Sequence, residues 1–164
     1  LSRLLGGDLT KILLEELEFV SVADDHVELR ARAGLDQFVV QSSRRVYLPR
    51  GPFRTQGAKV LERAGDPHDI FLTWRDHLKL TVALQAPGYV VSDGEPTRLA
   101  VDGVGEFRAR LEHADGKAAA TYYYRLDRKH YPAAKKRALL RFHDQFLGTR
   151  KRMFALKKNG SSTR

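Results

Sequence analysis

The chain has 164 residues, which is enough for one domain with a hydrophobic core but short for two. Hydrophobic residues make up 42% of the chain and charged residues 30%, as in ordinary globular proteins, and the absence of cysteine excludes disulfides, thiolate metal sites and cysteine nucleophiles. The net charge of +9 favours anionic partners, and no apolar run reaches the roughly 18 to 20 residues of a membrane-spanning helix.

The first patterned segment lies near the start of the chain. Asp8 is a suitable N-cap after a pair of glycines, and Ile12, Leu13 and Leu17 repeat at helical spacing, so the sequence predicts a short N-terminal helix. Apolar residues then alternate with polar ones from residue 20 to residue 31 around an Asp-Asp pair. This alternation predicts a β-hairpin.

The next segments are a strand and an ambiguous stretch. Residues 36–52 are predicted to form one strand that ends at Pro49 and Pro52. Residues 57–67 fit a short helix or a loop, and a glycine and a proline end the segment in either case.

The middle of the chain is rich in strand patterns. Residues 68–91 hold two β-rich runs, with clear alternation over residues 78–84 and a turn signal at Pro87-Gly88. Residues 97–128 hold three more runs, and Asp115-Gly116 is a typical hairpin turn. The alternation within these runs is that of half-buried antiparallel strands.

The hydrophobic period changes from two to 3.6 near the C-terminal end. Pro132 suits the first turn of a helix, and Gly148 suits the position just after its end. Three apolar residues lie on one face of this predicted helix, at positions i, i+3 and i+7: Leu139, Phe142 and Phe146. Residues 152–158 are predicted to form a short closing strand.

This order of elements predicts a mainly β fold, an antiparallel β-sandwich with a short N-terminal helix and one amphipathic C-terminal helix. Residues 1–67, the N-terminal helix and strands, are expected to belong to the same domain as the rest. Residues 68–158 are expected to form the β-sandwich core with the C-terminal helix. Residues 159–164 are expected to form a flexible tail.

Positive charge gathers in the last quarter of the chain. Residues 125–164 contain 13 Lys or Arg and two Asp or Glu, whereas the remaining residues have a net charge of −2. Seven of these cations are candidates for contacts with an anionic partner: Lys135, Lys136, Arg137, Arg141, Arg150, Lys151 and Arg152. Combined with Tyr122, Tyr123 and Tyr124 as stacking platforms, they would suit single-stranded nucleic acid.

The same segment can also be explained by its structure alone, without a nucleic-acid partner. The three tyrosines would alternate between the two faces of a strand, and the helix would bury its apolar stripe and expose its cations to water. The sequence contains no helix-turn-helix, zinc-finger or RNP-type signature that would favour specific nucleic-acid recognition.

A second polar group lies before the central strands. Asp66, His68, Asp69, Asp76 and His77 carry oxygen and nitrogen donors suited to a metal or to acid–base chemistry. The proline at position 67 places Asp66, His68 and Asp69 in a turn, and Asp76 and His77 follow about eight residues later. This spacing does not ensure that the five side chains converge on one site. The two aspartates of the turn are expected to bond nearby backbone N–H groups. We therefore predict no metal site, no cofactor and no catalytic residue.

Three short motifs occur on this frame: Pro87-Gly88-Tyr89 between two strands, Tyr131-Pro132 at the helix start and Leu156-Lys157-Lys158 in the closing strand. With them, residues 68–158 resemble the carboxy-terminal β-sandwich domain of bacterial proteins that also carry an amino-terminal domain of unknown function and a transglutaminase-like domain. The resemblance implies an accessory, non-catalytic domain of a periplasmic or cell-envelope protein. The chain departs from such proteins because it contains no transglutaminase core and no cysteine, so any catalysis would belong to a neighbouring domain.

The expected function is therefore that of a non-catalytic accessory domain of a larger bacterial envelope-associated protein. It would act through contacts with a protein partner or with neighbouring domains of the same chain. The alternative is an anion-binding module that uses the basic C-terminal segment to bind nucleic acid or an acidic polymer. The chain begins at Leu1 without an initiating Met or a signal-peptide layout, which indicates a fragment or a processed product.

Overall fold

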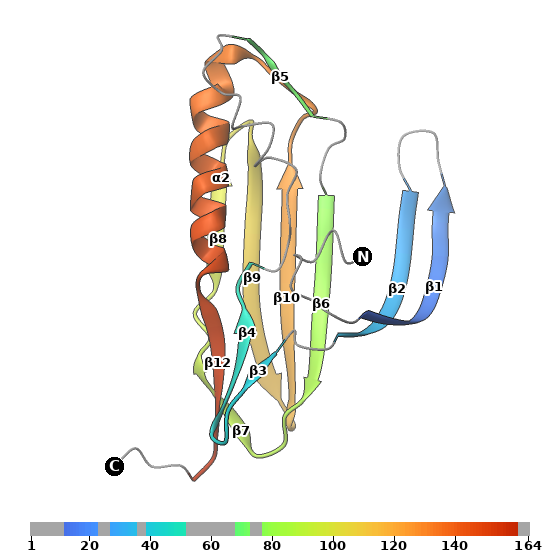
Figure 1. Cartoon of the computed structure of the whole chain (residues 1–164), viewed down its shortest axis with the longest axis vertical. Coiled ribbons are helices and arrows are strands. Elements are labelled where there is room, and N and C mark those ends of the chain that lie inside the picture. The colour runs from blue at the N-terminus through green and yellow to red at the C-terminus, as the bar shows by residue number, and fades with distance from the viewer. Residues whose placement is uncertain (1–11, 23–26, 36–38, 52–67, 73–76, 161–164) are drawn as a thin grey trace.

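The computed structural model describes residues 12–22, 27–35, 39–51, 68–72 and 77–160. These residues form two four-stranded antiparallel sheets, two smaller strand pairs and a C-terminal helix (Figure 1). The mainly β fold with one C-terminal helix is thereby confirmed.

The first sheet has the strand order β6-β10-β9-β8. Its strands are β6 (His77–Gln85), β10 (Lys117–Leu126), β9 (Gly105–Ala114) and β8 (Thr97–Val101). The predicted turn between β9 and β10 is present, because Asp115 and Gly116 both have left-handed φ angles, 50° and 71°. Two successive left-handed residues are what a two-residue type I′ hairpin requires.

Alternation along the strands gives the first sheet an apolar face and a polar face. Phe107, Ala109 and Leu111 are buried on one side of β9, and the residues between them are exposed on the other. The apolar face is called the inner face below, and the polar face the outer face. The inner face forms one half of the hydrophobic core.

The second sheet has the order β3-β4-β12-β7 and combines distant parts of the chain. Its strands are β3 (Val40–Gln41), β4 (Arg45–Pro49), β12 (Met153–Lys158) and β7 (Tyr89–Asp93). The prediction of a single strand over residues 36–52 is wrong, since β3 and β4 form a hairpin. Ser42 makes the turn: its backbone N–H donates to the carbonyl of Arg45 at 2.8 Å, and its hydroxyl accepts the Arg45 N–H at 3.1 Å.

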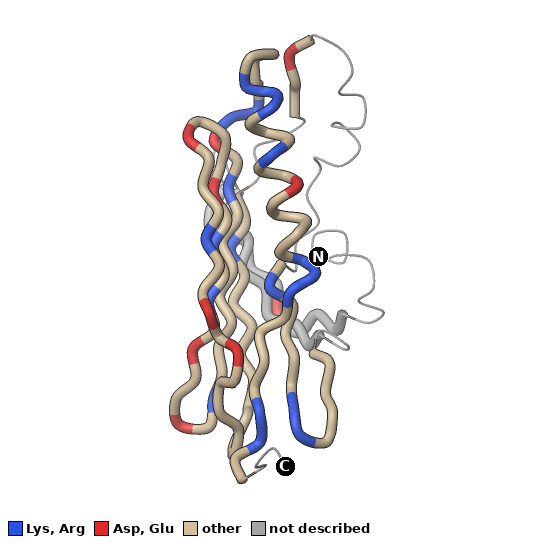
Figure 2. Tube along the Cα trace, turned by 90° about the vertical axis from the view of Figure 1, so that its left-hand side faces the viewer, with Lys and Arg blue, Asp and Glu red and all other residues tan. Residues whose placement is uncertain are grey.

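The helix and the second sheet cover the same inner face of the first sheet. A short 3-10 turn, η1 (Ala133–Lys135), leads into α2 (Lys136–Arg150). The Phe146 ring lies 5.0 Å from both the Phe107 and Tyr124 rings, and the Phe154 ring of the second sheet lies 6.4 Å from the Tyr122 ring. Figure 2 shows the first sheet on one side, with the helix above the second sheet on the other. One continuous core results.

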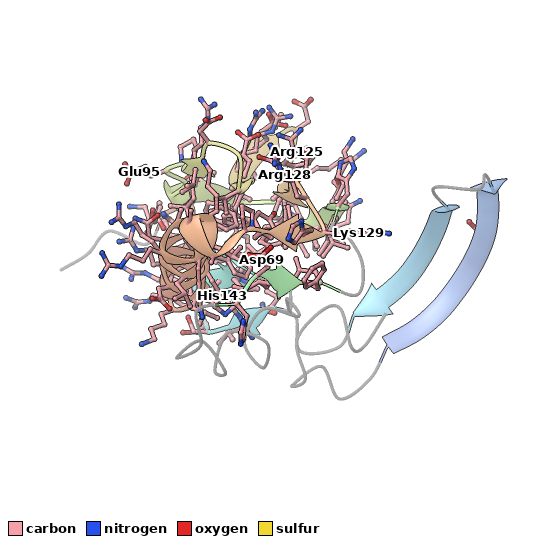
Figure 3. All side chains as sticks on the ribbon, turned by 90° about the horizontal axis from the view of Figure 1, so that it is seen from above. Asp69, Glu95, Arg125, Arg128, Lys129 and His143 are labelled. Carbon is pink, nitrogen blue, oxygen red and sulfur yellow. The ribbon has the colours of Figure 1, made fainter. Side chains whose placement is uncertain are left out.

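The N-terminal helix prediction is wrong for the described residues. Residues Ile12–Val22 form strand β1, which pairs with β2 (Val27–Leu35) as an antiparallel hairpin, so the predicted hairpin is confirmed with a longer first strand. Leu13 and Leu17 lie four positions apart, a spacing compatible with both the helical and the strand period. Figure 3 shows this hairpin standing away from the sheets and the helix. The proposed N-cap Asp8, the 57–67 segment and the last four residues lie outside the described part of the chain.

The C-terminal helix ends three residues later than predicted. Gly148 lies inside α2 instead of after it, because α2 continues to Arg150. Thr149 is buried and donates its hydroxyl hydrogen to the Phe146 carbonyl at 2.7 Å, while its own carbonyl accepts the Arg152 N–H at 3.0 Å. Packing and hydrogen bonding of Thr149 thus keep the last turn helical.

Gly148→Ala is expected to raise the free energy of unfolding by about 0.5–1 kcal/mol, since alanine loses less conformational freedom in a helix. A Cβ at this exposed position would meet nothing within 4 Å. Urea unfolding of both proteins measures the change. Gly105→Ala is the matched control, because its Cβ would lie 2.4 Å from the Arg125 carbonyl oxygen and should destabilise the protein. A destabilised Gly148→Ala protein would contradict the helical assignment.

His143 is expected to make the stability of the protein depend on pH. It lies on the buried face of α2, and burial lowers the pKa of its imidazole. As pH falls through about 6.5, the unfolded chain binds a proton on His143 before the folded chain does. The free energy of unfolding therefore decreases with falling pH until the folded-state pKa is passed.

His143→Leu is expected to flatten this pH dependence by removing the titrating group. The free energy of unfolding should be measured by urea titration at about pH 7.5 and about pH 5.5 for both proteins. The pKa values of Asp69 and Glu106 are lowered by hydrogen bonds to His130 and Arg108 respectively, so these carboxylates contribute mainly at more acidic pH. An unchanged slope in the variant would remove His143 as the cause.

Candidate interaction surface

The structure separates the three consecutive tyrosines. Tyr122 and Tyr124 are buried on the inner face of the first sheet, whereas Tyr123 lies on its outer face. Tyr122 donates its hydroxyl hydrogen to the Pro49 carbonyl at 2.8 Å, and burial raises the pKa of its phenol. The predicted alternation along the strand is therefore confirmed, and two of the three rings are not available as stacking platforms.

The seven cations predicted as a binding segment are distributed along the whole helix. Lys135, Lys136 and Arg137 lie at its start, Arg141 lies on its exposed side, and Arg150, Lys151 and Arg152 lie at its end. At 1.5 Å per residue the first and last groups are about 20 Å apart. Figure 2 shows these positions along the helix together with further cations on the first sheet.

A second group of cations lies on the outer face of the first sheet. Strand register and alternation place six cations and two carboxylates there: Lys79, Arg98, Arg108, Arg110, Lys117, Arg125, Glu106 and Glu112. All six cations are exposed. Tyr123 lies at the centre of one row, with Lys79 opposite it on β6 and Arg108 opposite it on β9. No local sequence pattern predicts this surface, because its residues come from four separate strands.

Both carboxylates of the outer face are paired with arginines. Glu106 accepts two hydrogen bonds from Arg108, at 2.6 and 2.8 Å, and one from Arg98 at 3.3 Å, and the Arg108 bonds hold the pKa of its carboxyl below the usual value. Glu112 lies 3.2 Å from Arg110. The Arg108 guanidinium also lies 5.8 Å from the centre of the Tyr123 ring. Arg125 is paired as well, with Asp127 just beyond the end of β10 at 3.0 Å. Counted with Asp127, the face has an excess of three positive charges.

Asp69 lies next to strand β5 (Ile70–Phe71), at the end of the molecule that is uppermost in Figure 1 and is called the upper end below. Several polar groups and rings contact one another there. The Asp69 carboxylate accepts a hydrogen bond from the Ala133 backbone N–H at 2.8 Å and lies 2.6 Å from Nε2 of His130. The bond to His130 is the main reason that the pKa of Asp69 is lowered. Phe71, in β5, stacks on the His130 ring in β11 (His130–Tyr131), with ring centres 4.5 Å apart.

This arrangement differs from the turn chemistry expected for Asp69. Its backbone partner is Ala133, 64 positions away, and not a neighbour within the turn. Within the described part of the chain no group of three or more His, Asp or Glu side chains is placed to hold a metal ion. Asp66 and Asp76 lie outside the described residues, whereas His77 lies at the start of β6, where its ring contacts that of Tyr123 at 5.4 Å.

Comparison with known proteins adds no relative to this picture. No protein-family model, curated protein or solved structure matches the chain. Among the described residues, no helix has both the length and the apolar character needed to cross a membrane. The outer face and the upper end are therefore interpreted from their own geometry.

Proposed function

We propose that this chain is a non-catalytic β-sandwich accessory domain of a larger bacterial envelope-associated protein, and that it binds an acidic surface of a protein partner or neighbouring domain. The observation that carries the binding part of this proposal is the excess of positive charge on the exposed outer face of the first sheet. The accessory-domain part rests on the resemblance of residues 68–158 described above. A polar outer face is ordinary for an antiparallel sheet, but an average surface intersperses both signs of charge.

The outer face has the physical properties of an electrostatic docking surface. Arg108 and Arg110 pair with Glu106 and Glu112 but remain 58% and 61% exposed, so a partner can reach their guanidinium groups. Arginine offers planar, bidentate hydrogen bonding to carboxylates, and an oppositely charged surface accelerates encounter. Arg98, Arg108 and Arg110 are adjacent on β8 and β9, so one acidic segment can reach all three.

Binding of a fluorescein-labelled poly-glutamate peptide, followed by fluorescence anisotropy, tests the proposal. The double variant Lys79→Glu/Arg110→Glu is expected to weaken binding about tenfold or more, since it reverses two charges at exposed positions. Arg137→Glu/Arg141→Glu, which changes the helix by the same charge, is the matched control and should have a smaller effect. Affinity should fall between about 50 mM and about 200 mM salt because exposed charges are screened.

Two results would overturn the proposal. Absence of poly-glutamate binding at low salt would remove the outer face as an acidic-partner surface. A larger loss in the helix variant than in the sheet variant would instead place binding on the C-terminal segment, as in the alternative of an anion-binding module built on the seven helix-associated cations.

A further inference from the structure

The upper end of the molecule presents an aromatic ring to solvent. Phe71 is 69% exposed, more than any other large hydrophobic residue in the described part of the chain. One face of its ring is stacked on His130, with an angle of 13° between the ring planes. The two rings thus form a parallel stack, called the ring pair below, on the β5–β11 strand pair. Strand β5 is labelled at the top of Figure 1.

Hydrogen bonds connect the ring pair to the neighbouring backbone and to Asp69. His130 and Phe71 are direct partners across the two strands, and the Leu72 N–H donates to the Lys129 carbonyl at 2.7 Å. Asp69 fixes the His130 ring through Nε2 and also bonds the Ala133 N–H at the start of the helix. A preorganised aromatic surface loses little conformational entropy on binding, as in the anchor positions of protein interfaces.

Cations continue from the outer face toward the ring pair. Arg125 lies near the end of β10, where it pairs with Asp127 at 3.0 Å, and the loop that follows carries Arg128 and Lys129 directly before His130. All three cations are exposed, and Figure 3 shows Arg125 and Arg128 on the same side of the molecule. A ligand that occupies both regions must combine negative charge with a ring or apolar group at one end.

We propose that the ring pair is the anchor site for an aromatic side chain within an acidic segment of the protein partner. This inference rests on the proposed function of the outer face. Aromatic pairs in offset stacking contribute about 0.5–1.5 kcal/mol beyond burial of area. The flanking Arg128 and Lys129 select acidic residues next to that aromatic side chain.

The geometry favours a protein segment over single-stranded nucleic acid. Proteins that bind single strands place successive rings along a basic groove, so that several bases stack. Tyr123, the other ring on this route, already lies beneath the Arg108 guanidinium and against the His77 ring edge. A single ring pair at the end of a charged face fits one anchor residue and an acidic flank.

Two labelled peptides separate the ring-pair contribution from that of charge: a poly-glutamate peptide with one central Trp, and the same peptide with Ala in its place. The protein is expected to bind the Trp peptide about fivefold more tightly than the Ala peptide. Phe71→Ala should abolish this preference and leave the affinity for the Ala peptide unchanged. Val40→Ala, at a residue 58% exposed on β3, is the matched control and should preserve the preference. Thermal unfolding of each variant verifies folding.

The outcomes distinguish the two proposals. If neither peptide binds, the proposed function of the outer face fails. If both peptides bind with equal affinity to the unmodified protein, the ring-pair inference is overturned while the outer-face proposal stands. If a labelled oligo-dT strand depends on Phe71 and the Trp preference is absent, the partner class is wrong and the ring pair is a base-stacking site.

Discussion

Phe146→Ala is expected to lower the free energy of unfolding by about 3–5 kcal/mol, the usual range for removing a buried phenylalanine. The side chain is fully buried and contacts the Phe107 and Tyr124 rings of the first sheet, each at 5.0 Å. It joins the helix to the sheet, so its removal leaves a cavity between the two layers. Urea or guanidinium unfolding followed by circular dichroism gives the difference.

Phe71→Ala is the matched control for this experiment, because it removes the same atoms from an exposed site. The expected loss of unfolding free energy is well below that of Phe146→Ala, because Phe71 is mostly exposed and contributes little buried apolar area. Equal losses in the two variants would contradict the packing of α2 on the inner face. A loss below about 1 kcal/mol for Phe146→Ala would do the same.

Asp93→Ala is expected to lower the free energy of unfolding by about 2–3 kcal/mol, somewhat less than for a fully buried ion pair because Asp93 is half exposed. Arg50 is buried, with its side chain 5% exposed, and its guanidinium pairs with Asp93, donates to the Met153 carbonyl at 3.2 Å and lies 4.8 Å from the Phe154 ring centre. Removal of Asp93 leaves this buried charge without its carboxylate. Chemical unfolding at constant pH measures the cost.

The double variant Arg50→Met/Asp93→Ala gives the sharper test of the same pair. Methionine fills a similar volume without a charge, so the double variant is expected to be more stable than Asp93→Ala alone. Additive losses from the two substitutions would mean that Arg50 acts through packing against Phe154 and not through its charge.

The elements that local chemistry determines can be predicted from the sequence. Asp115-Gly116 predicts a two-residue hairpin turn, and the alternation around Phe107 predicts a half-buried strand, and both are present. The secondary-structure predictions are wrong where one local pattern fits two structures. The spacing of Leu13 and Leu17 fits a helix as well as a strand, and this segment forms a strand because it pairs with β2. Gly148 is a plausible helix end until the burial of Thr149 extends the last turn.

The candidate surfaces were harder to predict because they depend on which strands are neighbours. The cations after residue 125 are conspicuous as a run, yet the helix spreads them along its length. The outer face gathers Lys79, Arg98 and Arg108 from three strands whose register no local pattern specifies. The pairing of Asp69 with His130 spans 61 positions and likewise has no local signal.

The position of β12 in the second sheet has a consequence for folding during synthesis. This strand lies between β4 and β7, and the hydrogen bond from Arg50 to Met153 joins residues 103 positions apart. A ribosome releases β4 and β7 long before β12, so the two earlier strands must wait with unpaired backbone edges. Such edges are templates for pairing with other chains. Until β12 emerges, the facing edges of β4 and β7 are therefore open to pairing with other chains.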